Sequence, residues 1–96
     1  AELQLEGLLN DTYAALANAY DEAFVLRDRA LPAAEQAYRD TQLAFEEGKL
    51  RFLDVLDAQR TLFELQTRHL QALENYHLVA AAAESLIGRS LVGLHQ

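Results

Sequence analysis

Two pairs of residues in this sequence have a spacing that could support chemistry. Asp54 and Asp57 are three residues apart, which puts both carboxylates on one face of a helix. Glu74 and His77 form an E-x-x-H pair, the spacing with which some helical bundles hold metal ions. Such a site requires a second E-x-x-H pair and two further glutamates, and the sequence contains no second copy. We therefore expect no metal site and no cofactor.

No set of residues suited to catalysis accompanies these pairs. The chain has no cysteine, which excludes thiol nucleophiles and thiolate metal ligands. Its few Ser and Thr residues have no evident histidine–carboxylate partners, and there is no Gly-rich phosphate loop. His69 lies among apolar residues. This position favours a histidine that pairs with another protein group or faces a lumen, and it disfavours a metal ligand. We expect that the protein is not an enzyme.

The charge and hydropathy of the chain exclude further classes. The formal net charge is −7, and only eight Lys and Arg residues are scattered over 96 positions. A basic patch for nucleic acid is therefore absent, and adsorption to anionic lipid is disfavoured. No uncharged apolar run reaches about 18 residues, so no membrane-spanning helix is expected. The acidic start differs from the basic lead of a signal peptide, so an exported parent protein would have its targeting segment outside this sequence.

The composition predicts an all-α fold, arranged as a long antiparallel helical hairpin. Leu and Ala, which favour helices, make up more than a third of the chain, with one proline and four glycines. We expect a single hairpin over residues 1–96: a helix over about 2–47, a tip turn at about 47–51, a helix over about 52–88 and a tail at 89–96. The first helix should be kinked or broken at 31–32, with Pro32 at the first position of a restarted helix. Gly48 should end it in the left-handed conformation.

Apolar residues follow a helical period in both halves of the chain. In the first half the predicted buried face consists of Leu9, Tyr13, Leu16, Tyr20, Phe24, Leu31, Ala34, Tyr38 and Phe45. In the second half it consists of Phe52, Val55, Leu62, Leu73, Tyr76, Ala80, Ala83 and Ile87. A second stripe lies beside it, at Leu53, Leu56, Phe63 and Leu70. One hairpin cannot cover two stripes, so further helices are implied, either from other subunits or from chain outside this sequence.

The segment that follows Gly48 resembles the tip of TolC-like outer-membrane factors, the outer membrane efflux proteins. The resemblance rests on Gly48, then on Asp-Val-Leu-Asp-Ala-Gln-Arg at 54–60, and it extends over most of residues 10–92. It is strongest to the heavy-metal efflux subgroup. It implies the C-terminal periplasmic hairpin of a trimeric channel, in which packed helices form a tunnel below an outer-membrane barrel.

The resemblance also implies partners and site residues. Gly48, Lys49, Leu50 and Arg51 match the turn that docks the periplasmic adaptor protein, which links the channel to an inner-membrane pump. Asp54 and Asp57 match the acidic ring at the tunnel entrance, where carboxylates favour cations and hold the tips closed. Leu50 stands where the enterobacterial archetype has arginine, so Lys49 or Arg51 is the expected basic partner of these carboxylates.

Simpler interpretations of the same residues stay open. Asp54 and Asp57 also suit the first turns of a helix, where carboxylates are favourable, and Leu50 also suits an isolated surface leucine. The alternative function is a free-standing helical hairpin that oligomerises as a structural four-helix bundle. The sequence does not identify the exported substrate.

Overall fold

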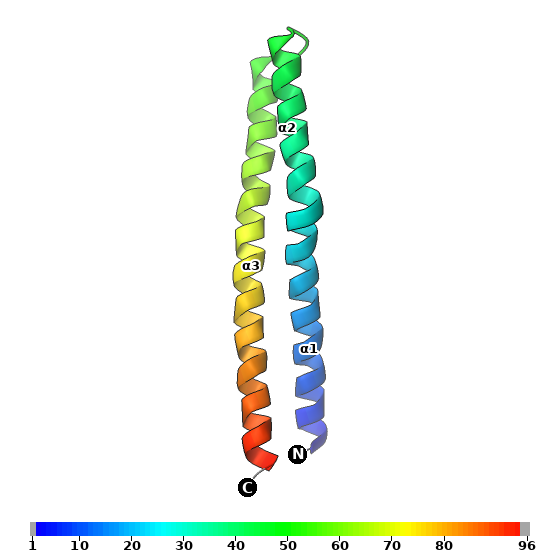
Figure 1. The fold of residues 1–96 in the computed structure, drawn as a ribbon, viewed down its shortest axis with the longest axis vertical. Helices are drawn as coiled ribbons and strands as arrows, with labels where there is room; N and C mark the ends of the chain where they lie inside the picture. Colours follow the sequence, from blue (N-terminus) through cyan, green and yellow to red (C-terminus); the bar gives the residue numbers. More distant parts are fainter. Residues whose placement is uncertain (1, 95–96) are drawn as a thin grey trace. The chain divides into compact units, whose positions relative to one another are not determined.

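The computed structural model describes the backbone of residues 2–94 and the side chains of residues 4–89. Its elements are α1 (Glu2–Val25), the π-helix η1 (Leu26–Ala30), α2 (Leu31–Glu46) and α3 (Phe52–Leu94) (Figure 1). Within the described backbone only residues 47–51 are not helical. The predicted all-α fold, with antiparallel helices and a tip near Gly48, is confirmed.

The residues form two compact units, and the first of these contains the turn. This turn unit spans Phe24–Gln71. In it, η1 and α2 run antiparallel to the first part of α3, and residues 47–51 join them (Figure 1). Leu26, Ala34 and Val55 are its most deeply buried side chains, each no more than 9% exposed. These three belong to three different elements, so the pairing of the helices is what buries them.

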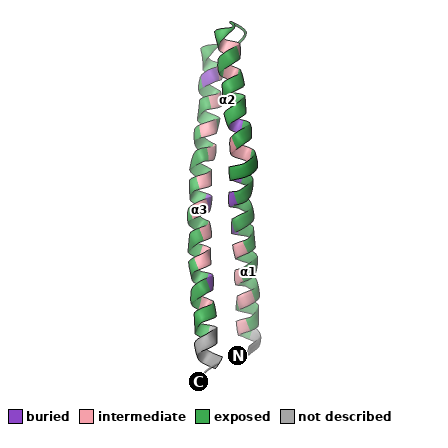
Figure 2. Cartoon of the chain, viewed as in Figure 1, coloured by how far each residue is buried: buried purple, intermediate pink, exposed green. Residues whose placement is uncertain are grey.

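The second unit consists of residues 1–23 and 72–96 and pairs most of α1 with the later part of α3. Among residues 4–23 and 72–89 of this unit, the buried side chains are all alanines, at positions 19, 23, 72 and 83. The rings of Tyr20 and Tyr76 pack at a centroid distance of 5.9 Å and a tilt of 59°. Buried and half-buried positions lie along the facing sides of the helices and exposed positions lie around them (Figure 2). Small side chains on the facing sides allow the two backbones to approach closely.

The predicted buried faces of both halves are partly wrong. In the second half, Phe52 and Ile87 are 59% and 36% exposed. The face of the first half departs further. Tyr13, Tyr20 and Phe24 are 55%, 51% and 39% exposed, although they were expected on this face. Ala19 and Ala23 occupy the buried positions instead, at 4% and 8% exposed. A large ring pointing straight at the other helix would hold the backbones apart, so the alanines take the centre and the rings lie at its edge.

The expected interruption near Pro32 is a π-helical turn, and the chain does not leave the helix there. The backbone N–H of Leu31 donates to the carbonyl of Leu26, five residues back, and Val25, Ala30 and Leu31 all have right-handed helical φ and ψ. Pro32 is the second residue of α2, one position after the first helical position that was predicted for it. Because proline lacks an N–H and its ring clashes with the carbonyl four residues earlier, a wider turn before it relieves both problems.

The same π turn shifts the buried positions of the helix by one residue along the sequence. Before it, this face runs through Leu16, Ala19, Ala23 and Leu26 at alternating steps of three and four. Continuing that step would bury Ala33, Ala37 and Asp40, yet all three are exposed. The covered positions lie one residue later, at Ala34, Tyr38 and Thr41. A π turn accommodates one extra residue, so it keeps each apolar face directed at the partner helix.

The second apolar stripe of α3 is uncovered, as the sequence predicted. Within the turn unit, Leu53 and Leu56 are 55% and 43% exposed, and Phe63 and Leu70 are both 67% exposed. These side chains recur on one side of the helix, at steps of three and seven. A contiguous apolar stripe of this kind marks a surface that another helix can cover.

The later end of α3 extends past the predicted end at Gly88 to Leu94. A glycine inside a helix costs about 1 kcal/mol relative to alanine, which is too little to stop a helix with good flanking residues. Of the tail expected at 89–96, residues 95–96 lie outside the described residues. Among the described helices, none combines the length and the apolar character needed to cross a membrane.

Candidate functional site at the turn between α2 and α3

The turn after α2 begins with a hydrogen-bonded helix ending. Gly48 has a φ of 77°, the left-handed conformation that glycine adopts without steric cost. Its N–H donates to the carbonyl of Phe45 at 2.9 Å, and the N–H of Lys49 donates to the carbonyl of Ala44 at 2.8 Å. These two bonds define a Schellman motif, with Glu47 as the C-cap. Gly48 therefore reverses the chain as predicted and leaves a well-defined turn.

The start of α3 is capped by one of the two predicted acidic residues. The carboxylate of Asp54 accepts a hydrogen bond from the backbone N–H of Arg51 at 3.0 Å. The N–H of Asp54 donates to the carbonyl of Arg51, also at 3.0 Å. This arrangement is the carboxylate half of a capping box, and it places a negative charge beside the positive end of the helix. Asp54 therefore has a local structural function.

Asp57 differs from Asp54 in its surroundings. It is exposed, and its carboxylate makes no hydrogen bond or ion pair with the residues that the structure describes. One turn of helix separates the two aspartates, as expected from their spacing. Asp57 is thus the carboxylate of this pair that is available to an external group.

The two basic residues of the turn pair with acidic neighbours. Nζ of Lys49 lies 2.8 Å from a carboxylate oxygen of Glu47, and Nε of Arg51 lies 3.9 Å from a carboxylate oxygen of Asp54. All four side chains are at least 36% exposed, so each pair contributes only about 0–1 kcal/mol to stability. Of the two expected basic partners, Arg51 is the one near Asp54.

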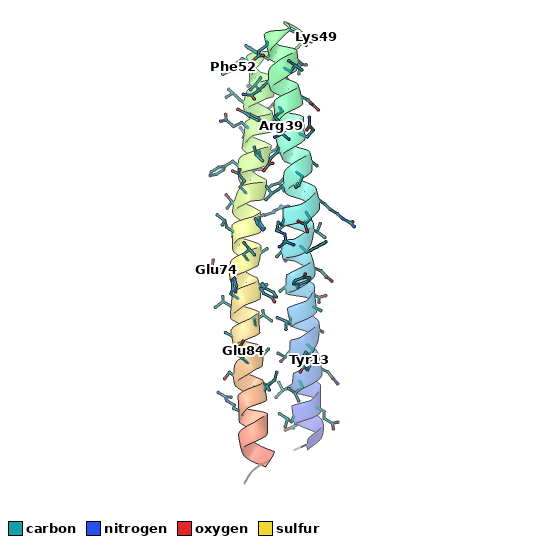
Figure 3. The ribbon with its side chains drawn as sticks, in the orientation of Figure 1. Tyr13, Arg39, Lys49, Phe52, Glu74 and Glu84 are labelled. Atoms are coloured by element: carbon teal, nitrogen blue, oxygen red, sulfur yellow. The ribbon has the colours of Figure 1, made fainter. Side chains whose placement is uncertain are left out.

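Apolar side chains surround this charged turn. Leu50 is 41% exposed and Phe52 is 59% exposed. Lys49 lies on the turn and Phe52 follows in the first turn of α3 (Figure 3). The rings of Phe45 and Phe52 pack at a centroid distance of 5.5 Å and a tilt of 60°. These two rings were not among the expected site residues, although their positions on either side of Gly48 indicate that they lie close to the turn.

A surface hollow of about 210 Å³ lies at this aromatic pair. Its lining consists of Gln42, Phe45, Glu46, Phe52 and Val55. The lining therefore comes from the last turns of α2 and the first turn of α3. It is an open depression on the surface, with apolar walls and two polar side chains.

Two of the three histidines, His69 and His77, lie among the residues that the structure describes. Nε2 of His69 is shielded from solvent and has no hydrogen-bond partner among the described residues, so the predicted protein partner is missing for this atom. Glu74 and His77 are both exposed. Among the described residues, no group of three or more His, Cys, Asp or Glu side chains converges as a metal site would require.

Asp28, on η1, carries the clearest electrostatic perturbation. Nε and a terminal nitrogen of Arg27 donate to its two carboxylate oxygens at 2.9 and 3.0 Å. This hydrogen-bonded guanidinium holds the pKa of Asp28 below its ordinary value, and His69 adds a smaller attraction. Because Asp28 is at the surface, the pair is a local feature of the π turn and forms no enclosed site.

No family model and no solved structure matches the chain. Among proteins of known function, the chain is 43% identical over 67 residues to the cobalt-zinc-cadmium resistance protein CzcC of Cupriavidus metallidurans. The match covers 70% of this chain and 16% of CzcC, so the chain spans a small part of that relative. The chain is therefore homologous to part of CzcC, a cobalt-zinc-cadmium resistance protein, which confirms the resemblance to the heavy-metal efflux subgroup that its sequence predicted.

Proposed function

We propose that this chain is the periplasmic helical hairpin of a trimeric outer-membrane efflux channel, and that its turn docks the periplasmic adaptor of a tripartite pump. The homology to CzcC supports an efflux role, and the antiparallel helices around Gly48 suit a periplasmic hairpin. The channel would be a passive duct, and the inner-membrane pump, reached through the adaptor, would supply the energy.

The observation that carries the docking proposal is the chemistry of the turn. Its backbone N–H groups at Gly48 and Lys49 are already hydrogen-bonded within the chain, and Leu50 is nevertheless left 41% exposed at its apex. An apolar side chain held on a hydrogen-bonded turn loses little conformational entropy on binding. The residues proposed to meet the adaptor are Gly48, Lys49, Leu50 and Arg51.

The uncovered stripe of α3 supports the multi-helix part of the proposal. Leu53, Leu56, Phe63 and Leu70 require a neighbouring helix, and a closed wall of hairpins would supply one. A free-standing hairpin that assembles as a four-helix bundle would cover the same stripe. The turn distinguishes the channel hairpin from the free-standing bundle, because only a channel entrance requires a partner at the turn.

The entrance carboxylates are assigned unequal roles. Asp54 caps α3, so part of its charge is already engaged. Asp57 is exposed and its carboxylate makes no hydrogen bond or ion pair with the described residues, so we assign the cation-favouring charge of the entrance chiefly to Asp57. Repeated around a trimer, one such carboxylate in each subunit would form a ring of negative potential.

Site-specific cross-linking tests the docking proposal. A cysteine replaces Leu50 in the full-length protein, and a second cysteine is placed at the hairpin tip of the adaptor from the same efflux system. We expect a disulfide-linked product with Leu50→Cys and none with Gln71→Cys, an exposed position on α3 away from the turn. If no position from Gly48 to Arg51 gives the product while both proteins are well produced, the four-helix-bundle function replaces this proposal.

A further inference from the structure

The charge of the chain is divided unevenly between its two units. The second unit, residues 1–23 and 72–96, carries seven carboxylate side chains and one arginine, Arg89, so its formal net charge is −6 of the −7 of the whole chain. The turn unit carries eight carboxylates and seven basic side chains and is nearly neutral. Most of the uncompensated charge therefore lies in the second unit, where it attracts basic partners.

Aromatic rings form a surface cluster in this second unit. Tyr20 of α1 packs against Tyr76 of α3 at a centroid distance of 5.9 Å, and Tyr76 packs edge-on against His77 at 5.6 Å. Tyr20 is 51% exposed and His77 is exposed as well. The ring contacts show which sides of the helices adjoin: the side of α1 that carries Tyr20 meets the side of α3 that carries Tyr76 and His77.

A second level of this surface lies two helical turns from the ring cluster. Tyr13 precedes Tyr20 by seven residues and Glu84 follows His77 by seven, so each lies on the same side of its helix as that ring. Because the helices are antiparallel, both steps lead to the same level, about 10 Å from the cluster. Tyr13 is 55% exposed and Glu84 is exposed (Figure 3). We call this surface the tyrosine face; it consists of Tyr13, Tyr20, Tyr76, His77 and Glu84.

The carboxylates at the tyrosine face form no ion pair with the described residues. This holds for Glu84, for Glu6 seven residues before Tyr13, and for Glu74 three residues before His77. Arg89 follows Glu84 by five residues, which directs it to a different side of α3. Tyrosine rings attract guanidinium groups through their π faces, and carboxylates bind the same groups through two parallel hydrogen bonds. The face thus offers both kinds of group that recognise arginine.

We propose that the tyrosine face docks a helix of a partner protein through two arginines spaced seven residues apart, one stacked on the ring of Tyr20 and the other placed between Tyr13 and Glu84. Residues seven apart share one side of the partner helix, so both arginines act at once. Arginine suits this face better than lysine, because its planar guanidinium both stacks on rings and pairs with a carboxylate through two hydrogen bonds.

A divalent metal ion fits the tyrosine face less well than arginine does. Tyrosine rings supply no ligands through their π faces, and among the described residues no group of three metal-ligating side chains converges. The inference goes beyond the proposed function and does not depend on it, since none of the residues of this face belongs to the turn unit. Failure of the Leu50 cross-link would leave it unaffected.

A synthetic helix tests the tyrosine face in the full-length protein. The probe is a labelled alanine-based peptide with two arginines seven residues apart, and the control peptide has the same composition with the arginines five residues apart, on different sides of the helix. Fluorescence anisotropy measures the affinity of each peptide. We expect the probe to bind at least about tenfold more tightly than the control, and replacing both arginines by lysine to weaken it.

Variants of the protein identify the groups that bind the probe. Tyr20→Leu removes the ring and keeps an apolar side chain, and Glu84→Gln removes one charge; each should weaken binding by about tenfold or more. Tyr20→Phe keeps the ring and should stay within about threefold. Glu22→Gln is the matched charge control, because Glu22 is exposed and lies two residues after Tyr20, on the opposite side of α1. It should stay within about twofold, and urea unfolding of every variant checks that the fold is retained.

The outcomes distinguish recognition from general attraction. Probe binding that requires Tyr20 and Glu84 but not Glu22, with unchanged unfolding, supports the inference. Equal binding of the probe, the control and the lysine peptide, or equal losses with Glu22→Gln and Glu84→Gln, overturns it, because net charge alone would then attract the peptide. If the protein binds Zn²⁺ alone by calorimetry, loses this binding with His77→Ala and does not bind the probe, the face holds a metal ion and the inference is wrong.

Discussion

Gly48 and Pro32 were both expected to interrupt a helix, and they have different effects. At Gly48 the backbone takes a φ of 77° and the helix ends. At Pro32 all neighbouring residues stay in the right-handed helical region, and the disturbance becomes the π turn η1. Both were expected as breaks from the residue type alone, yet only one reverses the chain.

The difference lies in what each residue permits. Glycine without a Cβ can adopt the left-handed conformation, and two hydrogen bonds then close the helix end. Proline fixes φ at a helical value and only removes one donor, so a wider turn is sufficient. In addition, the buried face needs one extra residue between Leu26 and Ala34, which the π turn provides. The turn at Gly48 depends on the conformation of one residue. The π turn η1 depends on the register of the whole buried face on that side of the hairpin.

The largest effect is expected at Gly48. A Gly48→Val substitution puts a β-branched residue into the left-handed conformation and should lower the free energy of unfolding by about 2 kcal/mol. Gly88→Ala is the matched control, since Gly88 lies within α3 with a negative φ; it should raise the free energy of unfolding by up to about 1 kcal/mol. Urea unfolding followed by circular dichroism, at one protein concentration, measures both. Equal effects at the two glycines would refute the conformational explanation.

A smaller effect is expected at Pro32. If the register demands the π turn, Pro32→Ala should leave η1 in place and raise the free energy of unfolding by no more than about 1 kcal/mol, well below the ~3 kcal/mol of a proline inside a regular helix. Deleting Arg29, an exposed residue of η1, together with Pro32→Ala should give a continuous α-helix. Amide hydrogen exchange at Leu31 and a structure of each variant measure this. If Pro32→Ala alone straightened the helix and buried Ala33 and Ala37, proline would be the cause.

The smallest effect is expected from Asp28 beside the π turn. Its folded-state pKa is lowered by Arg27, so it stabilises the folded chain above its unfolded pKa and loses this contribution as the pH falls through the folded value. Asp28→Asn should therefore be slightly less stable than the original at neutral pH, and the difference should vanish once the pH has fallen below the lowered folded-state pKa of Asp28. Because the carboxylate is exposed, added salt should also reduce the difference. A difference that grows in acid would contradict the assignment.

Much of the fold followed from residue types and spacing. The Leu- and Ala-rich composition predicted two helices, Gly48 predicted the turn between them, and the apolar period predicted the uncovered stripe at Leu53, Leu56, Phe63 and Leu70. The resemblance at residues 48–60 predicted the homology. Each of these depends on local conformational preference or on a regular period, which a sequence displays directly.

Other features could not be predicted because they depend on the distance between the two helices. Apolar character alone placed Tyr13, Tyr20 and Phe24 on the buried face, but close approach selects alanine there. The hollow beside Phe45 requires Phe52 from the next helix, on the far side of the turn.

The sequence by itself thus determined that the chain is helical, where it reverses and which stripe stays uncovered, because helix propensity, glycine at the turn and apolar period are properties of neighbouring residues. Only the tertiary structure decided which residues fill the space between the helices, that the interruption before Pro32 is a π turn, and that the aromatic rings flanking Gly48 form a hollow with Glu46 at its rim. These depend on how closely two distant segments approach, and the packing of side chains sets that distance.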